Sequence, residues 1–136
     1  KIFSAKELKG SMGRQLLTPT RIYVRPVLKL LQAVPLRGIV NITGGGFIDN
    51  LPRVLPAGLG AMIRKGSWPT PKLFDLVRDS GNISDLEMMR TFNLGIGLIV
   101  VLKKDDVKKV QNVLKPFKLS CWTMGEIIKG QGVEVQ

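Results

Sequence analysis

Hydrophobic positions recur along the chain at two spacings, one typical of helices and one typical of strands. The spacing i, i+3, i+4, i+7 predicts an amphipathic helix that buries one apolar stripe, and its members are Val24, Val27, Leu28 and Leu31. The same period predicts further helices after the glycines at 44–46, over 72–79, from Ser84 to Met89 and over 105–115. Compact apolar runs predict strands at 36–42, 59–64, 94–102, 119–128 and 133–135.

The strongest strand signal is the nearly uninterrupted apolar run at 94–102. Because polar and apolar residues do not alternate in it, the run predicts a central strand covered on both faces. Gly95 and Gly97 would share one face of that strand, which indicates that something packs closely there. Helices and strands alternate along the chain, which predicts an α+β fold with helices layered on a mixed sheet. We expect a basic arm at 1–18 and one domain at 19–136.

Composition excludes several kinds of site. The 136 residues are 44% hydrophobic, which favours one packed domain. Absence of histidine excludes a histidine base, a Ser-His-Asp triad and histidine metal ligands within this sequence. Cys121 is the sole cysteine, so an intramolecular disulfide and a cysteine-based zinc site are excluded, and we interpret Cys121 as a small buried hydrophobic residue. Because no apolar run approaches about 20 residues, we expect no membrane span.

The net charge is +11, and it is unevenly distributed. Residues 1–30 carry seven basic side chains and one acidic side chain. This surplus favours an anionic partner, such as a nucleotide, a nucleic acid or an acidic protein face, although a solvated basic face fits equally well. The sequence begins without methionine, which favours a processed product, a fragment or an incompletely read sequence.

The stretch N-I-T-G-G-G-F-I-D-N-L-P-R-V-L-P, residues 41–56, places three glycines between a predicted strand and a predicted short helix. Glycines permit positive φ angles and close backbone approach, and the free amides at a helix start can face a phosphate. The pattern matches neither the P-loop nor the dinucleotide fingerprint. A phosphate-binding loop and a plain strand-to-helix turn are therefore both open.

Two further stretches carry candidate binding residues. In R-T-F-N-L-G-I-G, Arg90 could bind a carboxylate or phosphate and Asn93 could orient a substrate, or both could serve the backbone of a helix end and a strand start. In L-L-T-P-T-R-I-Y-V, Arg21 and Tyr23 could contact a phosphate or a base. Alternatively, they are a solvent-facing arginine and a half-buried tyrosine.

The sequence resembles the C-terminal domain of phosphoribosylformylglycinamidine cyclo-ligase, also called aminoimidazole ribonucleotide synthetase, in four motifs at consistent spacing: L-L-T-P-T-R-I-Y-V, N-I-T-G-G-G-F-I-D-N-L-P-R-V-L-P, G-S-W-P and M-M-R-T-F-N-L-G-I-G. The resemblance runs from about Leu16 to Val135. It implies a three-layer α/β/α domain, partly ferredoxin-like. It also implies an ATP- and magnesium-dependent ring closure of formylglycinamidine ribonucleotide in purine biosynthesis, in which the amide oxygen is activated by phosphorylation before a nitrogen attacks.

The resemblance also implies which residues form the site. The phosphate-facing loop would consist of Thr43, Gly44, Gly45 and Gly46, and the neighbouring motif positions are Asp49, Asn50, Arg53, Arg90, Thr91 and Asn93. Most nucleotide and magnesium ligands, and the main dimer interface, would belong to an N-terminal domain absent from this sequence, so the chain alone should not turn over. No metal ligand is expected within the chain itself.

Asn41 stands where the family carries histidine, immediately before I-T-G-G-G. Asparagine exchanges hydrogen bonds but not protons near neutral pH, so the chain would be impaired or silent if that histidine takes part in the chemistry.

An alternative function rests on the high positive charge. A catalytically silent relative could serve as a structural subunit of an RNA-containing or organellar assembly, for example a ribosome, by contacting phosphates. The basic residues that would do so are Lys6, Lys9, Arg14, Arg21, Arg25, Lys103, Lys104 and Lys108. Under either function we expect an intracellular protein, in the cytoplasm or in an organelle such as a mitochondrion or plastid.

Overall fold

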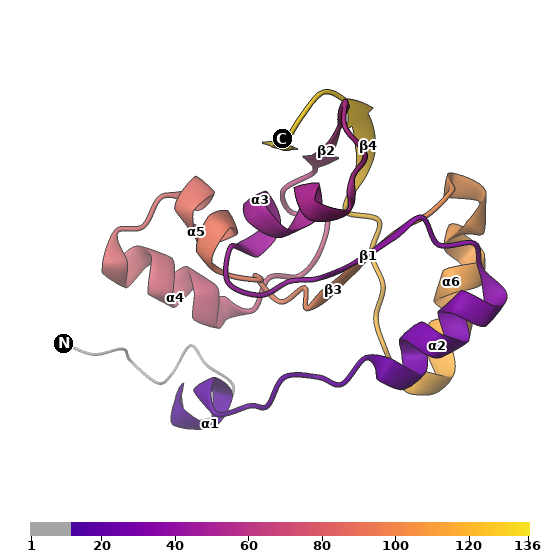
Figure 1. Cartoon of the computed structure of the whole chain (residues 1–136). Helices are drawn as coiled ribbons and strands as arrows, with labels where there is room; N and C mark the ends of the chain where they lie inside the picture. Colours follow the sequence, from indigo (N-terminus) through magenta and orange to yellow (C-terminus); the bar gives the residue numbers. More distant parts are fainter. Residues whose placement is uncertain (1–11) are drawn as a thin grey trace.

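The computed structural model describes residues 12–136, so the candidate nucleic-acid contacts Lys6 and Lys9 lie outside the described residues. Helices and strands alternate along most of the chain (Figure 1). The α-helices are α1 Met12–Leu16, α2 Val24–Ala33, α3 Gly46–Asn50, α4 Lys72–Gly81, α5 Asp85–Thr91 and α6 Val107–Leu114. The strands are β1 Gly38–Asn41, β2 Leu59–Ile63, β3 Leu98–Val101, β4 Gly125–Lys129 and β5 Val133–Val135, and short 3-10 turns occupy Leu51–Val54 (η1), Lys104–Asp106 (η2) and Lys115–Phe117 (η3).

The strands form two small sheets. β1 pairs antiparallel with β3, with Gly38 opposite Val101 and Asn41 opposite Leu98. In the second sheet β2 lies between β4, which is antiparallel to it, and β5, which is parallel to it. The predicted α+β class with a mixed sheet is therefore confirmed.

The predicted central strand at 94–102 is wrong in length and position. β3 begins only at Leu98 and pairs with β1 alone among the described strands, whereas β2 is the strand with neighbours on both sides. The first residues of the apolar run form a turn instead, because Leu94 and Gly95 both have positive φ, +48° and +93°. Apolar continuity indicated burial correctly, but it could not distinguish a buried turn from a strand.

The close packing expected at the two glycines is present, although both precede the strand. A Cβ built on Gly97 would lie 2.3 Å from the Tyr23 hydroxyl, and one on Gly95 would lie 2.6 Å from Pro71 Cδ. The backbone at these positions therefore leaves no room for a side chain.

Two groups of buried side chains hold the molecule together. The larger lies between the sheets and helices α3 and α5, and its members include Val40, Ile42, Phe47, Ile63, Trp68, Met89 and Ile99. The smaller joins α2 to α6 through Leu30, Val34, Val110 and Leu114. Cys121 packs against this second group but is half-buried rather than fully buried as interpreted, and this burial raises the pKa of its thiol.

Helix α2 forms as predicted, but it buries a different face from the predicted one. Leu30 is 2% exposed and Pro26 is buried, whereas Val24, Leu28 and Leu31 are 62%, 56% and 53% exposed. The helix carries apolar residues on two faces about 120° apart, and periodicity does not reveal which face meets α6. The predicted stripe of this helix is thus turned outward.

The remaining helices and strands differ from expectation mainly at their ends. The last long strand begins at Gly125 rather than at 119. Helix α5 starts as its capping pattern predicts, because the Ser84 hydroxyl accepts a hydrogen bond from the Glu87 amide at 3.3 Å.

Within the described chain, no helix is both long enough and apolar enough to cross a bilayer.

Candidate functional site

The triple-glycine loop is a tight turn between β1 and α3. The amide of Ile42 donates to the carbonyl of Gly97 at 2.9 Å, which fixes the start of the loop on the edge of β3. The amide of Gly46 donates to the carbonyl of Thr43 at 3.0 Å and closes the turn. Gly45 and Gly46 have φ angles of +98° and +52°, in the left-handed region that favours glycine.

Asn50 holds this loop from inside the protein. Its side chain is 3% exposed, and its Nδ2 donates to the carbonyl oxygens of Gly46 at 2.7 Å, Gly44 at 3.3 Å and Thr43 at 3.4 Å. An amide group that bonds three successive parts of one turn restricts its shape. The structure therefore places Asn50, a predicted binding residue, as a positioning residue beneath the loop.

The three glycines are required for different reasons. A Cβ on Gly46 would lie 2.0 Å from the carbonyl oxygen of Met89, so the close contact with the end of α5 demands glycine there. A Cβ on Gly45 would lie 2.9 Å from Asp49 Cβ. Gly44 is exposed, has no positive φ, and a Cβ there would meet nothing within 4 Å. Neither packing nor backbone geometry explains the glycine at 44.

The loop leaves two of its glycine amides without a hydrogen bond inside the described part of the chain. Within residues 12–136, the amides of Gly44 and Gly45 have no acceptor. Backbone amides that point out of a glycine turn form a concave donor surface for anions. Asp49 is exposed beside the loop, and its carboxylate works against an anion bound there.

The contact of Gly46 with the end of α5 brings the second predicted motif to the loop. Arg90 is exposed in the last turn of α5, with its Nη1 4.0 Å from the Glu87 carboxylate, and the Thr91 hydroxyl donates to the same carboxylate at 3.1 Å. Asn93 accepts a hydrogen bond from the Gly95 amide at 3.0 Å through its side-chain oxygen. Asn93 thus stabilises the turn before β3, as one of the two interpretations of this motif held.

Asn41 and Arg53 flank the loop along the sequence. Asn41 is the exposed last residue of β1, two positions before Thr43. Arg53 is exposed on η1 and has no hydrogen-bond or ion-pair partner in the described part of the chain. The structure therefore gathers the glycines, Asn50 and the end of α5 at one place and leaves Arg53 one turn beyond it.

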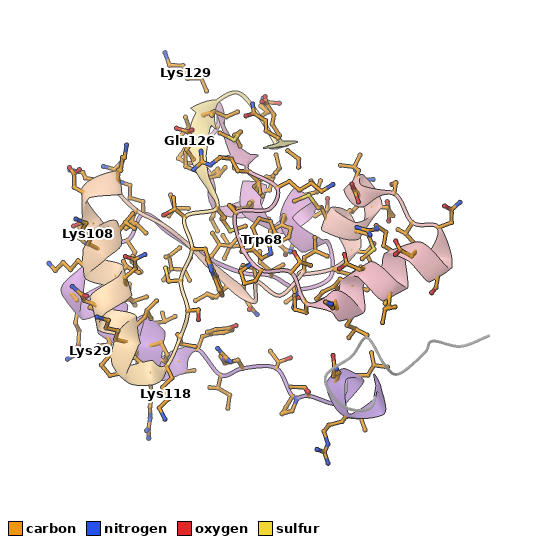
Figure 2. The ribbon with its side chains drawn as sticks, turned by 180° about the vertical axis from the view of Figure 1, so that it is seen from behind. Lys29, Trp68, Lys108, Lys118, Glu126 and Lys129 are labelled. Carbon is orange, nitrogen blue, oxygen red and sulfur yellow. The ribbon has the colours of Figure 1, made fainter. Side chains whose placement is uncertain are left out.

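Trp68 is the residue at this site to which the sequence analysis gave no role. Its indole Nε1 donates to the carbonyl of Leu94 at 3.0 Å, and its ring centroid lies 5.5 Å from that of Phe47 at an interplanar angle of 53°. Figure 2 shows Trp68 near the middle of the molecule. Trp68 thus connects Phe47, the residue after the glycines, to the turn before β3. Its place in the G-S-W-P motif was the sequence signal that could have indicated this role.

An ion-pair network lies near Trp68 on the far side of α5. Lys65 donates a hydrogen bond to Asp85, and Arg78 forms an ion pair with Asp85 at 3.8 Å. Arg78 also lies 2.9 Å from Asp79 and 3.4 Å from Asp75. The hydrogen bond and charge of Lys65 hold the pKa of Asp85 below its ordinary value. These exposed pairs stabilise the arrangement of α4 and α5 and face a cavity of about 180 Å³.

The basic residues considered for nucleic-acid contacts are distributed over several elements. Arg14 lies on α1, and Arg21 and Arg25 lie just before α2 and in its first turn. Lys103 and Lys104 lie just before and on η2, and Lys108 lies in the first turn of α6. Arg21 and Arg25 line one cavity together with Lys118. Within residues 12–136, no three His, Cys, Asp or Glu side chains are grouped so that they could hold a metal ion.

Comparisons with known proteins show to which family the chain belongs. Residues 1–136 match the family described as AIR synthase related protein, C-terminal domain. The chain is 46% identical over 126 residues to phosphoribosylformylglycinamidine cyclo-ligase of Caldicellulosiruptor bescii, covering 93% of this chain and 37% of that enzyme. The corresponding enzyme of Methylobacillus flagellatus is 49% identical over 116 residues, which cover 85% of this chain and 33% of that enzyme. The chain thus spans about a third of the length of these relatives.

Solved structures share the fold at low sequence identity. Thiamine-monophosphate kinase from Stenotrophomonas maltophilia has a TM-score of 0.65 at 21% identity, over 89% of this chain and 37% of the kinase. The E. coli hydrogenase maturation protein HypE has a TM-score of 0.62 at 18% identity, over 90% of this chain and 39% of that protein. The family match over the whole sequence is decisive: the chain belongs to the AIR synthase related protein family and contains its C-terminal domain.

Proposed function

We propose that this chain is the C-terminal part, about a third by length, of an ATP-dependent cyclo-ligase that closes the imidazole ring of formylglycinamidine ribonucleotide in purine biosynthesis. The names of the relatives at 44–49% identity support the reaction. The observation that carries the proposal is the loop itself: the amides of Gly44 and Gly45 have no acceptor within residues 12–136, and neither a close contact nor a positive φ requires glycine at 44. Close approach of a phosphate group would require it.

In this proposal the chain binds and orients phosphate rather than reacting covalently. The loop amides would donate to phosphate oxygens of the ribonucleotide or of the phosphorylated amide, in a shape fixed by Asn50. Arg90 follows Met89, whose carbonyl oxygen lies against Gly46. A bound phosphate would compete with Glu87 for the Arg90 guanidinium, which would then add positive charge to the site. Trp68 and Phe47 keep the loop and the turn before β3 in register.

ATP and magnesium enter the proposal through the resemblance. Two amides at an exposed glycine turn fit a phosphate group, whereas the described residues offer no group of three carboxylates for magnesium. ATP would supply the phosphoryl group that activates the amide oxygen. We expect the magnesium ligands, most nucleotide contacts and the remainder of the active site in an N-terminal domain, and the complete protein inside the cell.

Asn41 determines which chemistry this chain can perform. At the end of β1 it can orient a polar group by hydrogen bonding but cannot transfer a proton near neutral pH. If proton transfer is needed at this position, Asn41→His should raise the turnover number without changing ribonucleotide affinity. An unchanged or lower turnover number would mean that Asn41 does not limit catalysis.

The experiment that tests the proposal uses a fusion in which this chain replaces the matching region of the C. bescii enzyme. ADP release that depends on formylglycinamidine ribonucleotide should appear, and Gly44→Ala should raise the KM for the ribonucleotide about tenfold, because a methyl group then occupies the position of a phosphate oxygen. Gly13→Ala is the matched control, since a Cβ on Gly13 also meets nothing within 4 Å. Equal KM values for the two variants would refute the role of the loop.

The RNA-bound alternative rested on the positive charge, the absent N-terminal domain and Asn41 in place of histidine. Neither the family match nor the relatives support it. Steeply salt-dependent RNA binding by the chain, together with no ribonucleotide-dependent ADP release from the fusion, would restore it.

A further inference from the structure

An outward apolar stripe runs along α2. Val24, Leu28 and Leu31 are 62%, 56% and 53% exposed, and Ile22, just before the helix, is 81% exposed. Their spacing within α2 is i, i+4 and i+7, so they form one continuous row about 10 Å long. Large apolar side chains gathered in this way mark an interaction surface rather than scattered surface hydrophobics.

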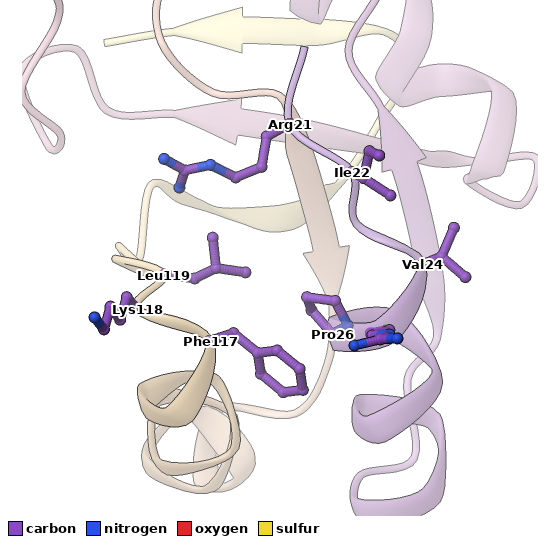
Figure 3. Close-up of a pocket in the computed structure, with 8 residues that line it drawn as sticks. Arg21, Ile22, Val24, Pro26, Phe117, Lys118 and Leu119 are labelled. Atoms are coloured by element: carbon purple, nitrogen blue, oxygen red, sulfur yellow. The ribbon is translucent and has the colours of Figure 1, made fainter. Parts of the chain in front are cut away.

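A groove begins where the stripe begins. Its volume is about 570 Å³, and it lies between the start of α2 and the segment that follows α6 (Figure 3). The apolar part of its lining comes from Ile22, Val24, Pro26, Phe117 and Leu119. Arg21, Arg25 and Lys118 complete the lining, and in residues 12–136 none of these three cations has a carboxylate partner. The groove therefore combines an apolar lining with unpaired positive charge.

This combination selects among possible occupants. A second copy of the chain would bring the same excess of positive charge to the groove, because the net charge is +11. A small ligand would be poorly enclosed, since Ile22 and Val24 are mostly exposed while lining the groove. A polypeptide with acidic and apolar side chains satisfies both the cations and the stripe.

The relatives indicate which polypeptide this is. The chain matches a C-terminal domain and covers 37% of the C. bescii enzyme, so a longer portion precedes the matched region there. The segment 17–23 passes from α1 into the groove, and Arg21 and Ile22 on it are part of the lining. A preceding portion would thus be linked covalently to the groove through residues 1–23, which raises its effective concentration there.

We propose that the groove and the α2 stripe dock the N-terminal portion of the cyclo-ligase through an acidic segment carrying apolar side chains. The inference rests on the proposed function for the identity of the partner. The surface is separate from the glycine loop: α2 and α6 lie together on one side of the molecule, while α3 and α5 lie on the other (Figure 1). The N-terminal portion would therefore be held by a contact that takes no part in phosphate binding.

Thiol accessibility tests the docking directly and needs no enzyme activity. In a Cys121→Ala background, Leu28→Cys is alkylated in the chain alone and in the C. bescii fusion. The rate constant should fall at least about tenfold in the fusion, as for a face covered nine-tenths of the time. Lys129→Cys, on β4 and far from α2 in Figure 2, is the control and should keep its rate. An unchanged Leu28→Cys rate, or an equal fall at both positions, overturns the proposal.

Charge reversal provides a second readout. Arg25→Glu with Lys118→Glu should restore fast alkylation of Leu28→Cys in the fusion, whereas Lys72→Glu with Lys129→Glu should not. If the fusion does not fold, as judged by circular dichroism, the unmatched N-terminal portion of the C. bescii enzyme is added in trans to the chain that carries Leu28→Cys. Lack of protection at saturating concentration then counts against docking.

Protection of Leu28→Cys by phosphatidylserine vesicles, without protection by the N-terminal portion, would assign the surface to a membrane and refute the proposal. Loss of ADP release with Leu28→Cys still protected would remove the proposed function and leave the docking.

Discussion

The glycine loop and helix α2 differ in how many of their groups have partners within the chain itself. At the loop, the buried amide of Asn50 bonds three carbonyl groups, and no buried side-chain polar atom among residues 12–136 lacks a partner. What remains open there is polar, namely two backbone amides. At α2, Leu30 is buried while Leu28 and Leu31, on the neighbouring face, are more than half exposed. The partner we propose for the first region is a small anion, and the partner we propose for the second is another protein surface.

The largest effect should come from filling the contact behind the loop. Gly46→Ala places a Cβ 2.0 Å from the Met89 carbonyl oxygen at a φ of +52°, so the loop or α5 must move. We expect the free energy of unfolding to fall by about 4 kcal/mol, measured by urea denaturation. Gly13→Ala is the control and should be close to neutral. A loss below about 1 kcal/mol would show that α5 moves aside at little cost.

The two faces of α2 should respond differently to the same truncation. Leu30→Ala should lower the free energy of unfolding by about 3 kcal/mol, because it leaves a cavity against Val110 and Leu114. Leu28→Ala should change it by less than about 0.5 kcal/mol in the isolated chain. Urea denaturation of both variants measures the difference. Similar losses for the two variants would mean that the stripe is already covered in solution.

Removing the amide beneath the loop should have an intermediate effect. Asn50→Ala leaves the carbonyl oxygens of Thr43, Gly44 and Gly46 without their donor, and we expect a loss of about 2 kcal/mol in urea denaturation. Because the loop also loses its shape, inorganic phosphate should bind more weakly, as measured by ³¹P line broadening. Retained phosphate binding in a folded Asn50→Ala variant would contradict the positioning role.

The smallest effect concerns the exposed ion pair of Lys65 with Asp85. The pKa of Asp85 is lowered in the folded chain, so its contribution to stability is complete above about pH 4, the ordinary value, and is lost as the pH falls through the folded value. Lys65→Met should therefore lower the urea midpoint slightly at pH 7, and the difference from the wild type should shrink below pH 4. Lys72→Met is the matched control and should show no such pH dependence. A difference that persists at low pH would exclude this ion pair as its cause.

Sequence reasoning succeeded where one short-range rule controls the outcome. The Ser84 cap, the turn at the three glycines and the strand at 59–63 all follow from local chemistry. It failed where a tertiary partner decides. The side of α2 that faces inward depends on α6, about 80 residues later, and the apolar run at 94–102 bends into a turn that Trp68 bonds at the Leu94 carbonyl.

Sequence motifs indicated candidate residues on the loop and on α5, but not the structural roles of those residues. The motifs led to the loop and to the end of α5. They could not show that Asn50 and Asn93 serve the backbone while Gly44 lacks a structural reason to be glycine, because those statements depend on burial and on neighbours in space. Trp68 was part of a recognised motif, yet its hydrogen bond to Leu94 and its ring contact with Phe47 could not be predicted from the sequence.

Tyr23, the residue before α2, packs closely against Gly97, which is bonded to the start of the glycine loop. Tyr23 lies between Ile22 and Val24 of the docking surface, and its hydroxyl occupies the space that any side chain at 97 would need. The carbonyl of Gly97 in turn holds Ile42, one residue before the loop. In evolutionary terms, neither position is free to change by itself. Across an alignment of relatives, a residue larger than glycine at 97 should accompany a smaller residue at 23, and independent variation at the two positions would show that the contact can be replaced.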